Sequence, residues 1–242
     1  KGQLTSNLRL NLDHEKYSLN TGITAYETLS GKDSDRYQYV LPYYTFSKNL
    51  ISNQLLSLNF NSNGKNNYQN TNNLKTNINN NFDFKSIDFI SESGFKNNIG
   101  VHFKNVNTVA KNDTKYRSSP QIELMNIINL QTSLPLVKLD DKFSNSLIPK
   151  ISFRYNPTDM KDYSDSDIYI DTSNIFSLNR LSISDAYESG QSLTIGVDYK
   201  KETINDINKF FEFNLANVLR DVKQDTISTT STLGEKQSNL FG

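Results

Sequence analysis

The sequence predicts an all-β fold, an antiparallel transmembrane β-barrel segment with roughly ten to twelve meandering strands of a larger barrel. Apolar and polar residues alternate with period two along almost the whole chain. Only 35% of the 242 residues are hydrophobic, whereas a soluble domain has about half. However, 13 Tyr and 14 Phe are too many for a disordered chain. A sheet with one polar face accounts for both observations.

Apolar residues occupy alternate positions in the first third of the chain, with turn formers between the stretches. Residues 4–12 and 17–25 are expected to form a hairpin around a turn at 14–16. Further strands are expected at 56–60 and 74–84, separated by a polar connection that contains a glycine.

The segment that reads RYQYVLPYYTF is a strand with a proline in its middle. Strict alternation places Tyr39 and Tyr43 on one face, and Tyr44 and Phe46 on the other. Pro42 cannot donate a hydrogen bond to a neighbouring strand, so we expect this strand to be bulged or unpaired there.

The rest of the chain continues the alternation. The segment 120–138 is compatible with a short helix or a strand. We expect a strand, because a proline and several hydroxyl residues interrupt it and no helix cap precedes it. No strand is expected in the closing QSNLFG. The remaining strands are expected at 87–89, 99–103, 151–155, 193–199 and 211–215.

Charge and composition exclude several classes. The 26 basic and 26 acidic residues give a net charge of +0, so no basic field attracts nucleic acid. The absence of Cys excludes disulfides and thiolate metal sites. No apolar run reaches the roughly 18 residues of a membrane helix, so membrane crossing requires a barrel. The chain starts at Lys1 without a leader, and we expect it to be mature or cut from a longer protein.

The sequence offers no catalytic, cofactor-binding or metal site, and we expect the protein not to be an enzyme. It has two histidines, His14 and His102, without the HExxH spacing of a zinc site. It also lacks the GxSxG nucleophile motif and glycine-rich phosphate loops. No pair of carboxylates stands out from the general acidic background.

Two clusters have alternative interpretations. The acidic segment 159–171 either binds a hard divalent cation or is an ordinary solvated loop. Tyrosines near strand ends either form an interfacial girdle or reflect ordinary β packing. These tyrosines are Tyr37, Tyr39, Tyr43, Tyr44, Tyr163 and Tyr169.

The most distinctive stretch reads NIFSLNRLSISDAYESGQSLTIGVDYK, from 174 to 200. It resembles the central block of the LptD family of outer-membrane lipopolysaccharide-assembly proteins, in which LF precedes NRFSG, DR, E, G and a glycine-containing strand. YVLP at 39–42, with Pro42, and SNLFG at 238–242 resemble two further elements of that family. The residues that carry the resemblance in the central block are Ile175, Phe176, Asn179, Arg180, Ser182, Asp185, Glu188, Gly190 and Gly196.

The resemblance implies a large barrel of about 26 strands in the Gram-negative cell outer membrane that inserts lipopolysaccharide into the outer leaflet. Its implied partners are lipopolysaccharide, a plug lipoprotein like LptE, a periplasmic bridge like LptA, and outer-membrane lipids. Residues 1–242 then form part of the barrel domain, without the N-terminal periplasmic domain and the remaining strands. The expected structural residues are Asn179, Arg180, Asp185, Glu188, Gly190, Gly196 and Pro42.

In such a barrel, Arg180 near Asp185 and Glu188 is expected to be a buried or lumen-facing cluster of mutually paired charges, and we expect it to pin a loop folded into the barrel. Two alternatives remain open. One is another outer-membrane barrel, such as a porin or receptor. The other is a secreted glycan-binding β-protein, in which aromatic and acidic residues would surround a cleft.

Overall fold

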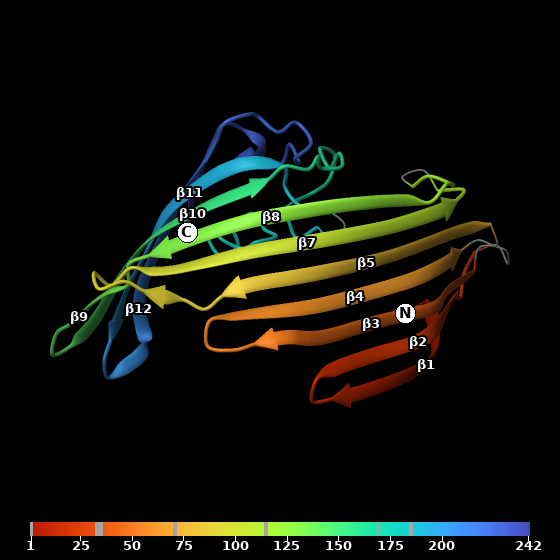
Figure 1. The fold of residues 1–242 in the computed structure, drawn as a ribbon, viewed down its shortest axis with the longest axis horizontal. Helices are drawn as coiled ribbons and strands as arrows, with labels where there is room; N and C mark the ends of the chain where they lie inside the picture. The colour runs from red at the N-terminus through yellow and green to blue at the C-terminus, as the bar shows by residue number, and fades with distance from the viewer. Residues whose placement is uncertain (1, 32–35, 70–71, 114–115, 169, 184–185) are drawn as a thin grey trace. The chain divides into compact units, whose positions relative to one another are not determined.

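The chain is all-β, as the sequence predicts. The computed structural model describes residues 2–31, 36–69, 72–113, 116–168, 170–183 and 186–242. Its 13 strands form one antiparallel sheet in the order β1-β2-β3-β4-β5-β7-β8-β10-β11-β12-β13, with β6 paired to β7 and β9 to β10 (Figure 1). No α-helix occurs within the described ranges.

Most strands are long and, apart from the short strands β6 and β9, consecutive strands are neighbours in the sheet. A 3₁₀ helix, η2 (Thr232–Gly234), lies in the connection before the last strand. The strands are β1 (Gln3–His14), β2 (Tyr17–Thr28), β3 (Tyr37–Ser52), β4 (Leu56–Gln69), β5 (Asn73–Ser86), β6 (Phe89–Ile90), β7 (Lys96–Lys111), β8 (Gln121–Ser133), β9 (Leu136–Leu139), β10 (Phe143–Asn156), β11 (Gly190–Thr203), β12 (Asp206–Arg220) and β13 (Gln237–Phe241).

The chain forms two compact units. The first unit contains residues 1–84 and 102–124, and the second contains 85–101 and 125–242. In the first unit, β1 and β2 form the expected hairpin, with Leu8 directly opposite Ile23. Directly opposed residues lie on the same face of a sheet, so the exposed leucines of β1 share a face with the apolar residues of β2.

A row of aromatic rings crosses this same face of the first unit. Neighbouring rings lie 6.1, 6.1, 4.7 and 6.4 Å apart between centroids. Aromatic neighbours at such distances each stabilise cross-strand pairing by about 0.5–1.5 kcal/mol. In order across the strands, the rings belong to Tyr17, Phe46, Phe60, Phe82 and Phe103.

Pro42 shifts the alternation within β3. The pairing register slips around it against both neighbouring strands, which confirms the expected bulge. Through their partners on β2, Tyr39 and Tyr44 lie on one face and Tyr43 lies on the other. The expectation from strict alternation that Tyr39 and Tyr43 share a face was therefore wrong, because the bulge inserts unpaired residues between them.

In the second unit, β10, β11 and β12 lie side by side (Figure 1) and define two faces of different character. We call one the apolar face; most of its large side chains, including Ile151, Ile195 and Phe213, are exposed. Its apolar residues on these strands are Leu147, Pro149, Ile151, Phe153, Tyr155, Leu193, Ile195, Val197, Tyr199, Phe211, Phe213, Leu215 and Leu219.

The opposite side of these strands is mostly polar, and we call its half next to the long connections the covered face. The side chains of the covered face are no more than 7% exposed, whereas Lys150, Asp198 and Lys200 toward the other end of the strands are partly exposed. Two long connections, 157–189 between β10 and β11 and 221–236 between β12 and β13, pack against it. The residues of the covered face on the three strands are Ser152, Arg154, Asn156, Ser192, Thr194, Ala216, Val218 and Arg220.

The hydrophobic core of the second unit lies between the covered face and the two connections. The larger share of it comes from the connections, because β12 contributes only Ala216 and Val218. The exposed apolar face therefore lies on the side away from the core. The core residues are Met160, Tyr163, Ile168, Ile175, Leu181, Ala186, Ala216, Val218, Ile227 and Leu233.

The sequence expectations for the segment 120–138 and for the closing QSNLFG have opposite outcomes. The ambiguous segment 120–138 contains β8 and most of β9, so it is strand, as expected. The closing QSNLFG also forms a strand, β13, which pairs with β12. The expectation of no strand there was wrong. Five residues show too little periodicity to predict a strand, and this one exists because the connection 221–236 returns the chain to β12.

Candidate functional site

The candidate site is the junction between the connection 157–189 and the covered face of the second unit. The ring of Phe176 lies against Gly196 of β11, where an added Cβ would come within 2.8 Å of the ring. Gln131 of β8 donates a hydrogen bond from Nε2 to the Phe176 carbonyl at 2.9 Å. The glycine therefore provides the space in which the connection seats this aromatic ring.

Arg180 and Glu188 form the centre of the site. The Arg180 Nε donates to Glu188 Oε2 at 2.6 Å, and Nη2 donates to Oε1. Their side chains are 1% and 3% exposed. A two-point contact between guanidinium and carboxylate fixes orientation as well as distance, so this pair holds the two ends of the segment 180–188 together.

Two further arginines reach the same carboxylate from the sheet. Arg154, near the end of β10, donates from Nη1 to Glu188 Oε2 at 3.4 Å, and Arg220, at the end of β12, donates from Nη2 to Oε1. Both arginines lie directly opposite Ser192 of β11 in the strand register. Glu188 therefore joins the connection to β10 and β12, the two strands on either side of β11.

The remaining guanidinium N–H groups bind protein oxygens. Arg180 also donates to the hydroxyls of Ser192 at 2.9 Å and Thr194 at 3.0 Å. Arg220 Nε donates to the carbonyl of Leu233 at 2.7 Å, and Arg154 Nη2 donates to the carbonyl of Ser177. The arginines thus bind both long connections to the strands.

The cluster contains three guanidinium groups and one carboxylate, which keeps the carboxylate ionised. Burial alone would raise the pKa of Glu188, which precedes β11. The charge and hydrogen bonds of Arg180 and the charges of Arg220 and Arg154 outweigh burial and hold this pKa well below its ordinary value. An ion pair of this kind is stable in a dry interior only when its hydrogen bonds are satisfied.

Sequence reasoning singled out Arg180 and Glu188 but not Arg154 and Arg220. The available signal was their position. Each arginine lies near the end of an alternating strand, at a position on the side opposite the apolar residues. What the sequence does not give is the strand register that places both beside Ser192.

The other residues of the family resemblance lie around this cluster or elsewhere in the sheet. Asn179 Nδ2 donates to the Ile183 carbonyl at 2.6 Å and closes the turn after Arg180. Gly190 begins β11 with φ of 77°, a conformation that favours glycine. Pro42 lies in the bulge of β3 in the first unit, and Asp185 lies outside the described residues.

The acidic segment 159–171 forms local turns. Asp162 Oδ1 accepts from the Ser164 N–H at 2.9 Å, and Asp171 Oδ1 accepts from the Ser173 N–H at 2.8 Å. Hydrogen bonds from these serines lower the pKa of both aspartates. Among the described residues, no group of three or more His, Asp or Glu side chains is arranged to hold a metal ion.

Of the two interpretations of the tyrosines, ordinary packing holds for Tyr163 and the interfacial girdle does not. The ring of Tyr163 is buried in the core beneath the connection. The neighbours of Tyr163 in the sequence are polar and give no sign of a core. The apolar residues that cover its ring come together only through tertiary packing. Tyr169 lies outside the described residues. Tyr37, Tyr39 and Tyr44 share one face of β3, and Tyr43 lies on the other.

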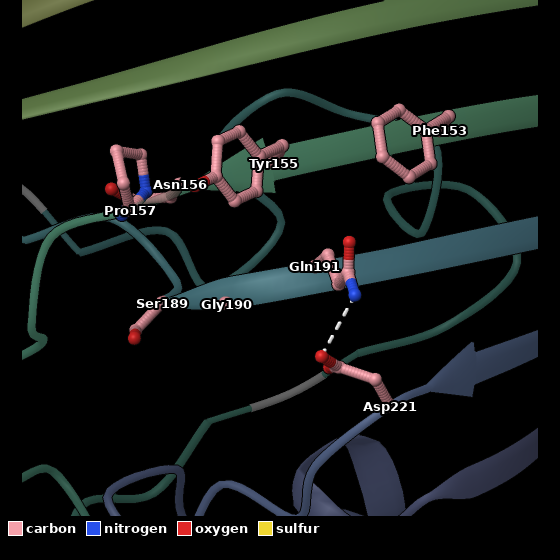
Figure 2. Close-up of a pocket in the computed structure, with 8 residues that line it drawn as sticks. All are labelled: Phe153, Tyr155, Asn156, Pro157, Ser189, Gly190, Gln191 and Asp221. Carbon is pink, nitrogen blue, oxygen red and sulfur yellow. Dashed lines mark hydrogen bonds between the residues drawn. The ribbon is translucent and has the colours of Figure 1, made fainter.

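A shallow groove of about 520 Å³ opens beside the cluster, at the ends of β10 and β12 and the start of β11 (Figure 2). Figure 2 shows the rings of Phe153 and Tyr155 projecting from β10, and Gln191 bonded to Asp221. The lining residues are Phe153, Tyr155, Asn156, Pro157, Ser189, Gly190, Gln191 and Asp221.

No known protein-family model matches the chain, and no curated protein matches it in sequence. Within the described ranges, the chain contains no helix with the length and apolar character needed to span a membrane.

Proposed function

We propose that this chain is part of an outer-membrane β-barrel that inserts lipopolysaccharide into the outer leaflet. The observation that carries the membrane location is the apolar face of the second unit. Its large side chains are exposed on the side away from the core. An extended apolar surface of this kind is unfavourable in water and marks a surface that contacts lipid or another protein.

Strand length supports the same location. The strands β10, β11 and β12 contain 14, 14 and 15 residues, more than the roughly 9–11 that a tilted strand needs to cross a bilayer. They alternate between the apolar face and the covered face. A barrel strand with lipid on one side and a polar interior on the other requires this pattern.

The connections of the second unit suggest an orientation. At one end of the strands, β11 and β12 are joined by a tight turn at 204–205. At the other end, the long connections 157–189 and 221–236 fold back over the covered face. Outer-membrane barrels have short periplasmic turns and longer extracellular loops, so we assign the end with the long connections to the cell exterior.

The substrate comes from the resemblance to the LptD family. Several residues that carry it, among them Phe176, Arg180, Glu188 and Gly196, hold the connection 157–189 against the sheet. They bind and position, and we assign them no catalytic role. The proposed partners are lipopolysaccharide, a plug lipoprotein like LptE, a periplasmic bridge like LptA that docks outside this chain, and outer-membrane lipids.

Fractionation of cells that contain the full-length protein tests the membrane location. We expect it in the outer-membrane fraction, released by detergent and retained after alkaline washing, because the apolar face needs lipid or detergent. Recovery in the soluble fraction would eliminate the barrel and favour a secreted glycan-binding protein.

Depletion of the protein in its host tests the transported substrate. We expect lipopolysaccharide at the cell surface to fall while the abundance of an unrelated outer-membrane barrel stays constant at early times. A porin or receptor with the same apolar face would leave surface lipopolysaccharide unchanged, and that result would reject the transport function while keeping the barrel.

A further inference from the structure

We propose that the groove beside the charge cluster binds a neutral saccharide, with a sugar ring against Tyr155. This inference rests on the groove and not on lipopolysaccharide transport. Phe153 and Tyr155 are the last residues of β10 on the apolar face, so we place the groove at the outer rim of the barrel, beyond the part of that face that contacts lipid. Only this setting depends on the proposed function.

The groove presents a row of three side chains across three strands. Tyr155 of β10 is directly opposite Gln191 of β11. Gln191 Nε2 donates to Asp221 Oδ2, just beyond β12, at 2.8 Å. The row therefore runs from an aromatic ring to an amide and then to a carboxylate, all on the same side of the sheet (Figure 2).

The two aromatic rings provide an apolar platform. Tyr155 and Phe153 are 40% and 37% exposed, so neither ring is covered by the connections. A sugar ring presents one face of C–H groups, and such a face packs against an exposed aromatic ring by burial of apolar area.

The polar groups of the groove can both donate hydrogen bonds to sugar hydroxyls and accept hydrogen bonds from them. Asp221 and the amide oxygen of Gln191 accept hydrogen bonds, and the amide N–H₂ of Gln191 donates. Among the described residues, the hydroxyls of Tyr155 and Ser189 have no hydrogen-bond partner. Alternating donors and acceptors next to an aromatic ring match a polyhydroxylated ring better than a purely apolar ligand.

Charge argues against an anionic ligand. Asp221 is the one ionised group among the residues that line the groove. The neighbouring Arg220 is buried and directs its guanidinium to Glu188, to the Leu233 carbonyl and to the Ser189 carbonyl. A phosphate would meet the Asp221 carboxylate without an exposed cation in the groove lining, so the groove favours a neutral ligand over the phosphate of a lipid headgroup.

The core of the groove is rigid. Asn156 is 1% exposed, donates to the Glu188 carbonyl at 3.1 Å and accepts from the Thr158 N–H at 2.9 Å. Ser189 follows the Glu188 anchor directly. A site that is held in place before the ligand arrives loses less conformational entropy on binding.

Titration calorimetry on the full chain, kept in a detergent without a sugar headgroup, tests the proposal. The probes are maltohexaose, cellohexaose and hexa-N-acetylchitohexaose, with glycerophosphoethanolamine as the headgroup control. We expect at least one saccharide to bind. Tyr155→Ala and Asp221→Asn should each weaken binding by about tenfold or more, and Tyr155→Phe should weaken it less.

Phe213→Ala is the matched control, because Phe213 is an exposed ring on the same apolar face but outside the groove. It should bind as the unmodified chain does. If Tyr155→Ala does not fold, the nearly isosteric Asp221→Asn decides. The proposal is overturned if no saccharide binds, if Asp221→Asn binds unchanged, or if only glycerophosphoethanolamine binds. None of these results bears on surface lipopolysaccharide, so the transport function is tested separately.

Discussion

Arg180 and Glu188 meet through two hydrogen bonds in the interior of the second unit, eight residues apart in the chain. Arg154 and Arg220 approach the same carboxylate from the sheet. The Glu188 carboxylate is therefore the point at which the most charged groups of the connection 157–189 and the strands meet, and changes at Glu188 or Arg180 should act on that connection before they act on the strands.

Arg180→Ala should destabilise the second unit by about 3–5 kcal/mol, because it leaves Glu188 buried with fewer of its compensating charges. Heat or urea unfolding measures the loss. Limited proteolysis should show cleavage within 157–189 earlier than in the strands, since the connection loses its main fastening.

Lys223→Ala is the control for this experiment. Lys223 forms ion pairs with Asp225 and Glu235, but all three side chains are about half exposed or more. Exposed pairs contribute about 0–1 kcal/mol. If Arg180→Ala were no more destabilising than Lys223→Ala, the cluster would not be the fastening that the geometry indicates.

The stability of the connection should depend on acid pH through Glu188. Its pKa in the folded chain lies below the ordinary value of 4.5 expected in the unfolded chain. The stabilisation is therefore complete above about pH 4.5 and is lost as the pH falls from there toward the lower folded pKa. Proteolysis of 157–189 by an acid-active protease across this range measures the effect.

Glu188→Gln separates this titration from those of other carboxylates. The variant should be less stable at neutral pH, because three guanidinium groups lose their carboxylate. It should also lose the part of the pH dependence that Glu188 supplies. An identical pH profile in Glu188→Gln and the unmodified chain would show that other carboxylates cause the acid sensitivity.

The sequence predicts the fold class and half of the charge cluster for the same physical reason, which is that both depend on local spacing. Period-two alternation can be recognised within each strand by itself, and Arg180 lies in the same short block of sequence as Glu188. By contrast, Arg154 and Arg220 lie 34 and 32 residues from Glu188. Only the strand register brings them together.

The bulge in β3 illustrates a second limit on what can be predicted from the sequence. The proline predicts an irregularity, because it has no N–H to donate, but it does not say how many residues remain unpaired. That number decides whether Tyr43 or Tyr44 shares a face with Tyr39. Burial of Tyr163 is unpredictable for a related reason, since the core that covers it is assembled from two connections distant in sequence.

Gly196→Ala should destabilise the second unit by about 1–3 kcal/mol, because an added methyl group has no room. Its Cβ would lie 2.7 Å from the Leu215 carbonyl oxygen and 2.8 Å from the ring of Phe176. Thermal unfolding measures the loss, and Phe176→Leu in the same chain should recover part of it. Gly2→Ala is the control, since nothing lies within 4 Å of its added Cβ. Equal stability of Gly196→Ala and the unmodified chain would contradict the close seating of Phe176.

Ile195→Arg tests whether the apolar face contacts lipid. Ile195 is 42% exposed and lies opposite Ile151 in the middle of the paired strands. On a face in water, such a substitution changes stability by no more than about 0.5 kcal/mol. Near the middle of a bilayer it costs about 2–4 kcal/mol, so we expect a clear loss of stability in lipid vesicles, measured by urea unfolding.

Ile204→Arg provides the matched control for the lipid test. Ile204 is similarly exposed, at 47%, but lies in the turn between β11 and β12, where a barrel strand leaves the bilayer. An arginine near the interface costs only about 0–1 kcal/mol. The difference between the two variants therefore reports depth in the bilayer and cancels the effect of charge alone. Equal stability of the two variants in vesicles would mean that the middle of the apolar face does not meet hydrocarbon, and the barrel proposal would fail at its main support.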